Sequence, residues 1–294
     1  MDDLISESTA NGKFKRIDWN KNFLPTTAAV AGEWHCLFRG GGNPAADSIM
    51  NTGTNLAFQS LTDSTSNATG IQHGGAVSPD TKHIINASAF TAAATTAPCI
   101  LMLVDLLGFY RVTSVTTTTA QTLDNTVTLP RYTTGAGVQA FIYNTNATPL
   151  GAGTPNLSLS SYTNSAGTAS RATPTVLPIG KTAAANGLIL YSGTGVGKYG
   201  PFMPLQGSDA GIRSVQTFTS STSYVSGEYA IVLCKPLLTL PITTLGVAAE
   251  RDLVNQMPSM PQIVDGACLA WLMYSGAATP VNSAIYGHLD VAWG

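Results

Sequence analysis

The chain has 294 residues, of which only 10% are charged, and its formal net charge at pH 7 is -2. An ordinary soluble domain carries about 25% charged residues, so uncharged polar residues must cover much of this surface. The near-neutral balance argues against a nucleic-acid partner, because binding to phosphates needs clustered Lys and Arg. A polar but uncharged surface is typical of proteins that sit within extracellular or virion assemblies.

The sequence shows no membrane partner. The opening MDDLISES is not a secretory signal, and the longest apolar run, Ile100–Leu107, is interrupted by Asp105. It is far shorter than the ~20 residues of a membrane-spanning helix. We therefore expect synthesis in a cytoplasm. The four cysteines lie far apart in apolar contexts, so we expect buried free thiols. They are Cys36, Cys99, Cys234 and Cys268.

Residues 1–30 mix charge, Asn and Thr without a steady period. Basic and aromatic residues occur together in this segment, at Lys13, Lys15, Arg16 and Trp19. One interpretation is an extended N-terminal arm that docks on another protein through these four residues. The other is a strand-like start that folds onto the core of its own chain.

Several short segments alternate apolar and polar residues with the period of two that marks strands. They are Glu33–Arg39, Val138–Tyr143, Leu157–Tyr162, Gly187–Tyr191 and Ala284–Trp293. Ile100–Val112 and Gly266–Tyr274 are continuous apolar runs, as expected of strands covered on both faces. Asp105, within the first run, should then find a hydrogen-bonding partner or lie at an edge, since a bare buried carboxylate is costly.

The stretch Ile212–Pro241 predicts a central hairpin. Tyr229–Cys234 is an unbroken apolar run between Gly227 and Pro236, and Ile212–Phe218 precedes it across a loop of about eight residues. We expect these two strands to pair with each other. After them, residues 245–255 (LGVAAERDLVN) predict one short helix that ends before Pro258 and Pro261.

The predicted fold is therefore mainly β, a jelly-roll or sandwich-like domain with an extended N-terminal arm and one short helix near residues 245–255. We expect the arm over residues 1–30 and a single β-rich domain over residues 31–294. The strongest β core is expected over residues 97–241.

No motif in the sequence supports catalysis. The stretch Ser192–Gly200 lacks the first Gly of a phosphate-binding loop, and Tyr199 stands where Ser or Thr would hold magnesium. The four histidines are isolated, without the spacing of metal ligands, at His35, His73, His83 and His288. We expect no enzymatic activity, no cofactor and no metal.

Six tyrosines in or near predicted loops suggest a platform for stacking sugars. They are Tyr132, Tyr143, Tyr162, Tyr191, Tyr199 and Tyr224. The alternative, which we favour, is that these rings pack at strand ends with their hydroxyl groups in water.

Six segments resemble virion structural proteins of tailed bacteriophages, and together they cover most of the chain beyond residue 100. The segments are LMLVDLLGFYRV (101–112), QTLDNTVTLPRYTTGAGVQAFI (121–142), NLSLSSYTNSAG (156–167), PFMPLQGSDAGIRSVQ (201–216), YAIVLCKPLLTLP (229–241) and ERDLVNQMPSMPQIVDGACLAWL (250–272). The resemblance implies a structural role in the virion, and proteins that look like this are often homotrimers.

Within that group, the sequence favours a decoration (cement) protein that stabilises the outer surface of a phage capsid. A major capsid protein would need a long spine helix, and a fibre shaft would show repeats. We therefore expect the major capsid protein as partner, a homotrimer, and a place on the capsid surface, with contacts through the segment that contains Lys13, Lys15, Arg16 and Trp19. The alternative is a tail- or fibre-associated structural or receptor-binding protein, which predicts an aromatic patch of sugar size.

Overall fold

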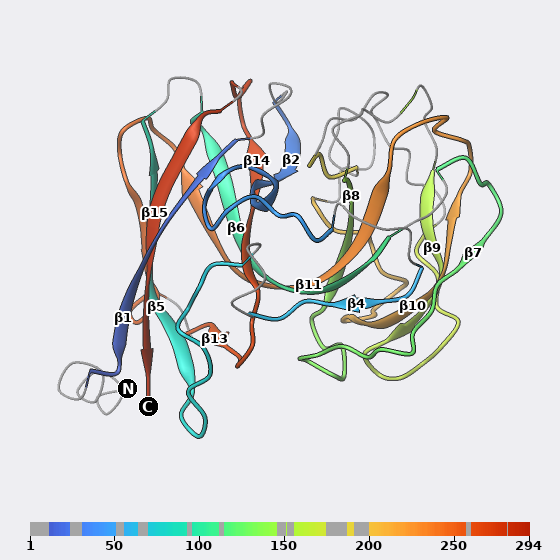
Figure 1. The fold of residues 1–294 in the computed structure, drawn as a ribbon, viewed down its shortest axis with the longest axis horizontal. Helices are drawn as coiled ribbons and strands as arrows, with labels where there is room; N and C mark the ends of the chain where they lie inside the picture. The colour runs from blue at the N-terminus through green and yellow to red at the C-terminus, as the bar shows by residue number, and fades with distance from the viewer. Residues whose placement is uncertain are drawn as a thin grey trace.

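The computed structural model describes residues 12–23, 31–50, 56–63, 70–92, 96–111, 115–145, 151, 156–174, 187–190, 200–256, 260–280 and 282–294. Its strands form three sheets, and every pairing between named strands is antiparallel. Figure 1 shows one sheet on the left, one in the middle and one on the right. We call them the terminal, central and distal sheets. The expectation of a mainly β, sandwich-like domain is confirmed.

The central sheet is built around its two longest strands. Its order is β2 (Glu33–Cys36), β14 (Leu269–Ser275), β6 (Cys99–Arg111), β11 (Tyr229–Ile242) and β8 (Gln139–Asn144), with β4 (Gln59–Ser60) also on β6. β6 and β11 pair along nearly their whole length. Because both faces of this sheet are covered, its strands read as continuous apolar runs, as the sequence predicts for β6 and β14. The segment that follows β2 departs from the prediction, since Leu37–Arg39 forms a single 3-10 turn, η1.

The terminal sheet contains the first and last described strands of the chain. Its order is β12 (Ala249–Asp252), β5 (Lys82–Thr91), β15 (Ala284–Trp293), β1 (Phe14–Asn22) and β3 (Gly42–Asn43), with β13 (Gln262–Ile263) also on β5. β1 pairs with β15 in unbroken register over nine residues. The extended-arm interpretation is therefore wrong for residues 14–22, which fold onto the core of their own chain.

The distal sheet overturns the predicted central hairpin. Its order is β7 (Gln121–Thr122), β10 (Ile212–Ser220) and β9 (Leu157–Asn164), so β10 and β11 belong to different sheets. The two strands face each other across a core, where the rings of Phe218 and Tyr229 lie 5.6 Å apart. β11 is apolar on both faces and takes β6 and β8 as neighbours, because these strands are equally apolar.

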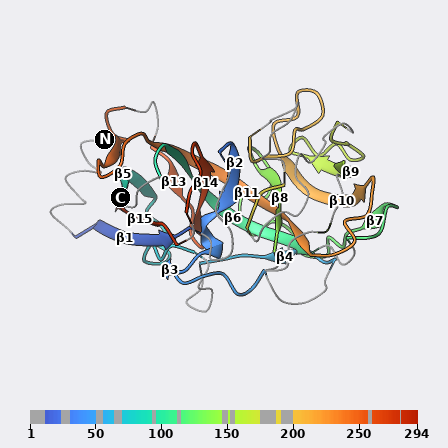
Figure 2. The same cartoon turned by 90° about the horizontal axis from the view of Figure 1, so that it is seen from above.

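One face of the central sheet carries two separate hydrophobic cores. Seen from above, β6 and β11 run from the terminal sheet towards the distal sheet (Figure 2). Leu103 of β6 belongs to the core under the terminal sheet, and Leu107 belongs to the core under the distal sheet. The opposite face packs against η1 and connecting segments, through residues such as Phe38 and Ile189. The molecule is thus a sandwich in which the terminal and distal sheets both pack on one face of the central sheet.

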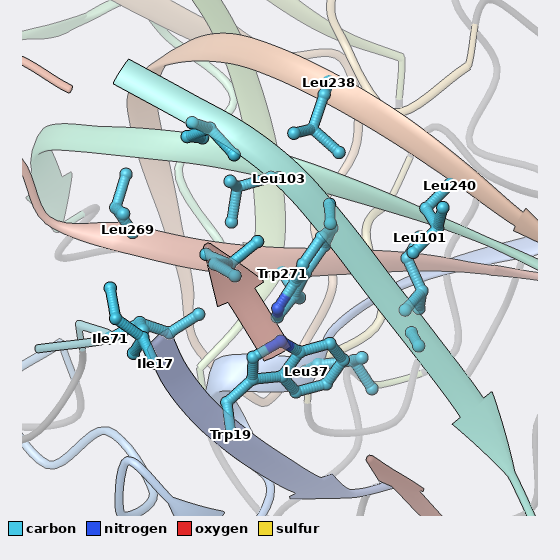
Figure 3. Close-up of a cluster of buried hydrophobic side chains, with 14 of the residues drawn as sticks. Ile17, Trp19, Leu37, Ile71, Leu101, Leu103, Leu238, Leu240, Leu269 and Trp271 are labelled. Atoms are coloured by element: carbon cyan, nitrogen blue, oxygen red, sulfur yellow. The ribbon is translucent and has the colours of Figure 1, made fainter. Parts of the chain in front are cut away.

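The core under the terminal sheet is centred on two tryptophans. The rings of Trp19 from β1 and Trp271 from β14 lie 5.0 Å apart, surrounded by leucines of β6 and β11 (Figure 3). Trp19 pairs with Gly287 of β15, and a Cβ on this glycine would collide with the indole of Trp19 and with the carbonyl of Ser88. The bare backbone at Gly287 is what lets the indole lie against β15.

The predicted helix over residues 245–255 is wrong. Ala249–Asp252 forms β12, which pairs with Asn86–Ala89 at the edge of β5. Gly246 has a φ of +70°, which is not a helical conformation. The hydrogen bonds that pairing with β5 supplies to the backbone outweigh the helix propensity of the Ala and Leu residues here, which is a weak determinant.

We predict that Trp19→Ala lowers the free energy of unfolding by about 3–5 kcal/mol, the usual cost of removing a large buried aromatic side chain. Urea denaturation followed by tryptophan fluorescence and circular dichroism measures this change. Phe14→Ala is the matched control, since Phe14 lies on the same strand with 41% of its surface exposed. Equal, small effects of both substitutions would show that β1 is not part of the core.

Candidate functional site

The exposed face of the terminal sheet carries three rows of side chains, which the strand register aligns across the sheet. The first row is Asn43, Asn20, Tyr286 and Phe90; the second is Asp18, His288, Ser88 and Glu250; the third is Arg16, Asp290, Asn86 and Asp252. Side chains alternate between the two faces of a strand, so these residues lie opposite the tryptophan core.

A shallow hollow of about 350 Å³ lies over the first two rows. Its lining includes Asp18, Asn20, Asn43, Phe90, Tyr286 and His288. Phe90 and Tyr286 form a cross-strand pair whose rings are stacked at 5.5 Å with an interplanar angle of 25°. Each of these two residues keeps 38% of its surface exposed. An exposed aromatic pair beside amide and carboxylate groups is suited to binding a ligand that is part apolar and part hydroxylated.

The polar groups of the hollow are oriented by the backbone. The side-chain oxygen of Asn20 accepts a hydrogen bond from the backbone N–H of Asn43 at 2.7 Å, and the side-chain amide of Asn43 donates to the carbonyl of Asp18 at 3.3 Å. Asp18 is exposed, and its carboxylate makes no hydrogen bond within the described ranges. The hollow therefore presents two side-chain amides that are oriented by hydrogen bonds to the backbone, and one carboxylate that is available to a ligand.

The third row, by contrast, forms its own ion pair. Arg16 donates from two nitrogens to the two carboxylate oxygens of Asp290, each at 2.8 Å. Burial acts to raise the pKa of Asp290, but the guanidinium of Arg16 outweighs it and holds this pKa below its ordinary value. His288 lies 3.8 Å from the same carboxylate. The positive charge of Arg16 is thus neutralised beside the hollow.

The structure does not bring the four predicted contact residues to one surface. Arg16 lies on the exposed face of β1, whereas Trp19 is buried with 3% of its surface exposed. Lys13 forms an ion pair with Asp80 at 2.9 Å. Lys15 points to the same side as Trp19 and lies next to Gly74. Strict alternation along β1 separates them, and a prediction that treated the segment as an arm could not anticipate that separation.

The tyrosines proposed as a platform do not form one where the structure describes them. Tyr143, Tyr162 and Tyr224 are fully buried, and Tyr132 is partly buried against the distal core. Tyr191 and Tyr199 lie outside the described residues, as does the glycine-rich stretch up to residue 199. The exposed pair Phe90 and Tyr286 was missed. The alternation within Ala284–Trp293 could have indicated this pair, because it places Tyr286 on the face of the strand opposite to that of the apolar Ile285.

The histidines and cysteines of the described residues are either buried or half-buried. Lys82 donates from its ammonium to Nδ1 of His73 at 3.1 Å, which places the ring proton on Nε2, facing Asp63 and the carbonyl of Ala267. No group of three His, Cys, Asp or Glu side chains in the described part of the chain is arranged to hold a metal ion. The four cysteines are buried free thiols, as predicted. Burial raises the pKa of Cys99 to about 12.

A second polar cluster ties the distal sheet to its neighbouring loop. Asp209 accepts hydrogen bonds from Arg171 at 2.9 and 3.1 Å, from the Tyr162 hydroxyl at 2.6 Å and from the Asn164 amide at 2.8 Å. The hydrogen bonds from Arg171 are the largest cause that lowers the pKa of Asp209, to about 2. These hydrogen bonds join β9 and Arg171 to the segment that precedes β10, which is a structural role.

Comparisons with protein-family models, with curated proteins and with solved structures found no match to this chain. Within the described ranges, no helix has the length and apolar character required to cross a bilayer. The hollow on the terminal sheet is therefore judged on its own geometry. Its lining includes His288, whose ring lies 3.8 Å from the carboxylate of Asp290 and whose cross-strand partner is Ser88.

We predict that protonation of Asp209 lowers the stability of the protein in acid. Its pKa is about 2 in the folded chain and about 3.9 in an unfolded one. The stabilisation is therefore complete above the unfolded value and is lost as the pH falls from about 4 towards 2. Urea denaturation of wild type and Asp209→Asn between these pH values measures the effect. The variant should show a flatter dependence on pH, and parallel curves would contradict the assignment.

Proposed function

We propose that the protein is a structural component of a tailed-phage virion that binds and stabilises the outer surface of the capsid. Six segments of the sequence resemble such proteins, and only 10% of the chain is charged. The observation that carries the proposal is that interior ionisable groups form hydrogen bonds that hold strands and loops together. Among the described residues, carboxylates such as Asp105 and Asp209 accept hydrogen bonds that join strands to loops, which suits a structural framework.

The proposed partner is the major capsid protein, and the proposed assembly is a homotrimer on the capsid surface. A protein that binds the mature shell and not its disassembled subunits stabilises the shell by mass action.

The proposed capsid contact retains the basic end of β1 without its tryptophan. Lys13, Lys15 and Arg16 remain the proposed contact residues, with Lys15 and Arg16 on opposite sides of the strand end, and Trp19 is removed from the set because it lies in the core. Lys13 keeps 30% of its side chain exposed despite its pair with Asp80. Such basic groups at a rim increase the association rate more than the final affinity.

A second candidate function is a receptor-binding role at the tail or fibre. The specific observation that favours it is the hollow beside Phe90 and Tyr286, because buried structural roles do not explain two stacked aromatic rings at the surface. A virion protein can carry such a site on a framework that is otherwise structural.

Cryo-electron microscopy of the virion, with copy number from quantitative mass spectrometry, tests the first proposal against the second. The capsid role predicts many copies arranged on the lattice of the head. A small ring of copies confined to the tail would contradict the capsid role and favour the receptor-binding role.

We predict that the double substitution Lys13→Ser and Lys15→Ser slows binding to heads that lack the protein. Co-sedimentation of samples taken at successive times and at several salt concentrations measures this, because contacts between exposed charges weaken with salt. The control is Arg213→Ser, an exposed basic residue of β10 in the distal sheet. If both variants bind as wild type does at every salt concentration, the basic end of β1 is not the contact.

A further inference from the structure

We propose that the hollow on the exposed face of the terminal sheet binds the terminal sugar of a neutral glycan. This inference rests on the second candidate function, and it names the ligand class and the residues of that role. The ligand would lie against Tyr286 and Phe90, and its hydroxyl groups would bond to Asp18, Asn20 and Asn43. These residues come from four strands, β1, β3, β5 and β15, so the site exists only in the assembled sheet.

The aromatic pair supplies the apolar half of sugar recognition. A pyranose has one face of C–H groups, and these carry partial positive charge that is attracted to the negative face of an aromatic ring. The rings of Phe90 and Tyr286 are held at 5.5 Å by their cross-strand pairing. Their exposed surface is thus fixed before a ligand arrives, so binding costs little side-chain entropy.

The amides and the carboxylate supply the polar half. Neighbouring sugar hydroxyls each donate and accept, and an amide group offers both a donor and an acceptor, whereas a carboxylate accepts two donors. Asn20 and Asn43 use one atom each on the backbone of the sheet, so their remaining amide atoms are oriented for a ligand. The Asp18 carboxylate has both oxygens available among the described residues.

The charge of the hollow favours a neutral sugar over an anionic one. Its lining includes the carboxylate of Asp18, and the neighbouring cation, Arg16, lies outside the lining and is paired with Asp290 through Nε and Nη2. A sialic acid or a sugar phosphate would bring a second negative charge next to Asp18, and no Lys or Arg is among the described residues that line the hollow. Like charges this close disfavour binding.

The size and openness of the hollow fit the end of a glycan chain. Its volume of about 350 Å³ lies at the lower end of small-ligand sites, which span about 300–1,000 Å³. The site is shallow, so the rest of the glycan can leave towards solvent. A single hexose in such a site is expected to bind with a dissociation constant of about millimolar order.

Saturation-transfer NMR on the full-length protein tests the proposal. The probes are the methyl glycosides of glucose, galactose, mannose and N-acetylglucosamine, with N-acetylneuraminic acid and glucose 6-phosphate as anionic counterparts. We expect transfer to the ring C–H protons of at least one neutral probe and none to the anionic probes. Tyr286→Ala should abolish the signal, and Asp18→Asn should weaken binding by about tenfold.

Phe14→Ala is the matched control, because Phe14 is an exposed aromatic on the same face of β1 but outside the hollow. It should bind sugar as wild type does, and thermal denaturation should show that the variants are folded. No transfer to any neutral probe, or equal transfer in Tyr286→Ala, would overturn the proposal. Co-sedimentation with heads is a separate readout, so loss of the sugar site would leave the capsid role standing.

Discussion

A buried ion pair lies at the seam between the two cores that share the central sheet. Arg131 donates to the two carboxylate oxygens of Asp105 at 2.6 and 2.9 Å, and its other bonds go to the carbonyls of Leu61 and Leu106. The backbone N–H of Cys268 adds a bond to Asp105 at 2.8 Å. Burial raises the pKa of Asp105, and Arg131 opposes that effect. Loss of one partner from such a pair costs about 3–5 kcal/mol, because it leaves the other charge buried and unpaired.

The position of Asp105 follows from the pairing of β6 with β11. Asp105 lies opposite Lys235, between two irregularities in the register that leave Leu107 on one strand and Leu237 on the other without a partner. Bulges of this kind bend and twist a strand. They let the same pair of strands serve two differently oriented partner sheets, and the ion pair fills the junction where neither core continues.

This arrangement separates the framework of the protein from its candidate site. The tryptophan core occupies the inner side of the terminal sheet and the ion pair lies on the central sheet, so the outer side of the terminal sheet is left for recognition. Tyr286 and Trp19 illustrate the division, since they lie on adjacent strands and face opposite ways. The side chains of the proposed sugar site are therefore already positioned by the sheet, so ordering them costs little of the binding free energy.

The sequence predicted several of the strands but not β5 or β12, and it did not predict which strands pair. Apolar runs predicted β6, β14 and the first part of β11, and the cost of a buried carboxylate correctly required a partner for Asp105. Periodicity says which residues share a face, yet it does not say which strand lies beside it. That is why β10 and β11 were wrongly paired, why residues 14–22 were interpreted as an arm, and why residues 245–255 were expected to be helical. The hollow was missed for the same reason, because it exists only once β1, β3, β5 and β15 are aligned.

Hydrogen exchange during urea denaturation of Arg131→Met tests most directly whether the ion pair joins the two cores into one cooperative unit. Amides of β1 and β15 report on the terminal core, and amides of β9 and β10 report on the distal core. In the wild-type protein both sets should lose protection at the same urea concentration, and in the variant the two transitions should separate. A single coincident transition in the variant would contradict the account.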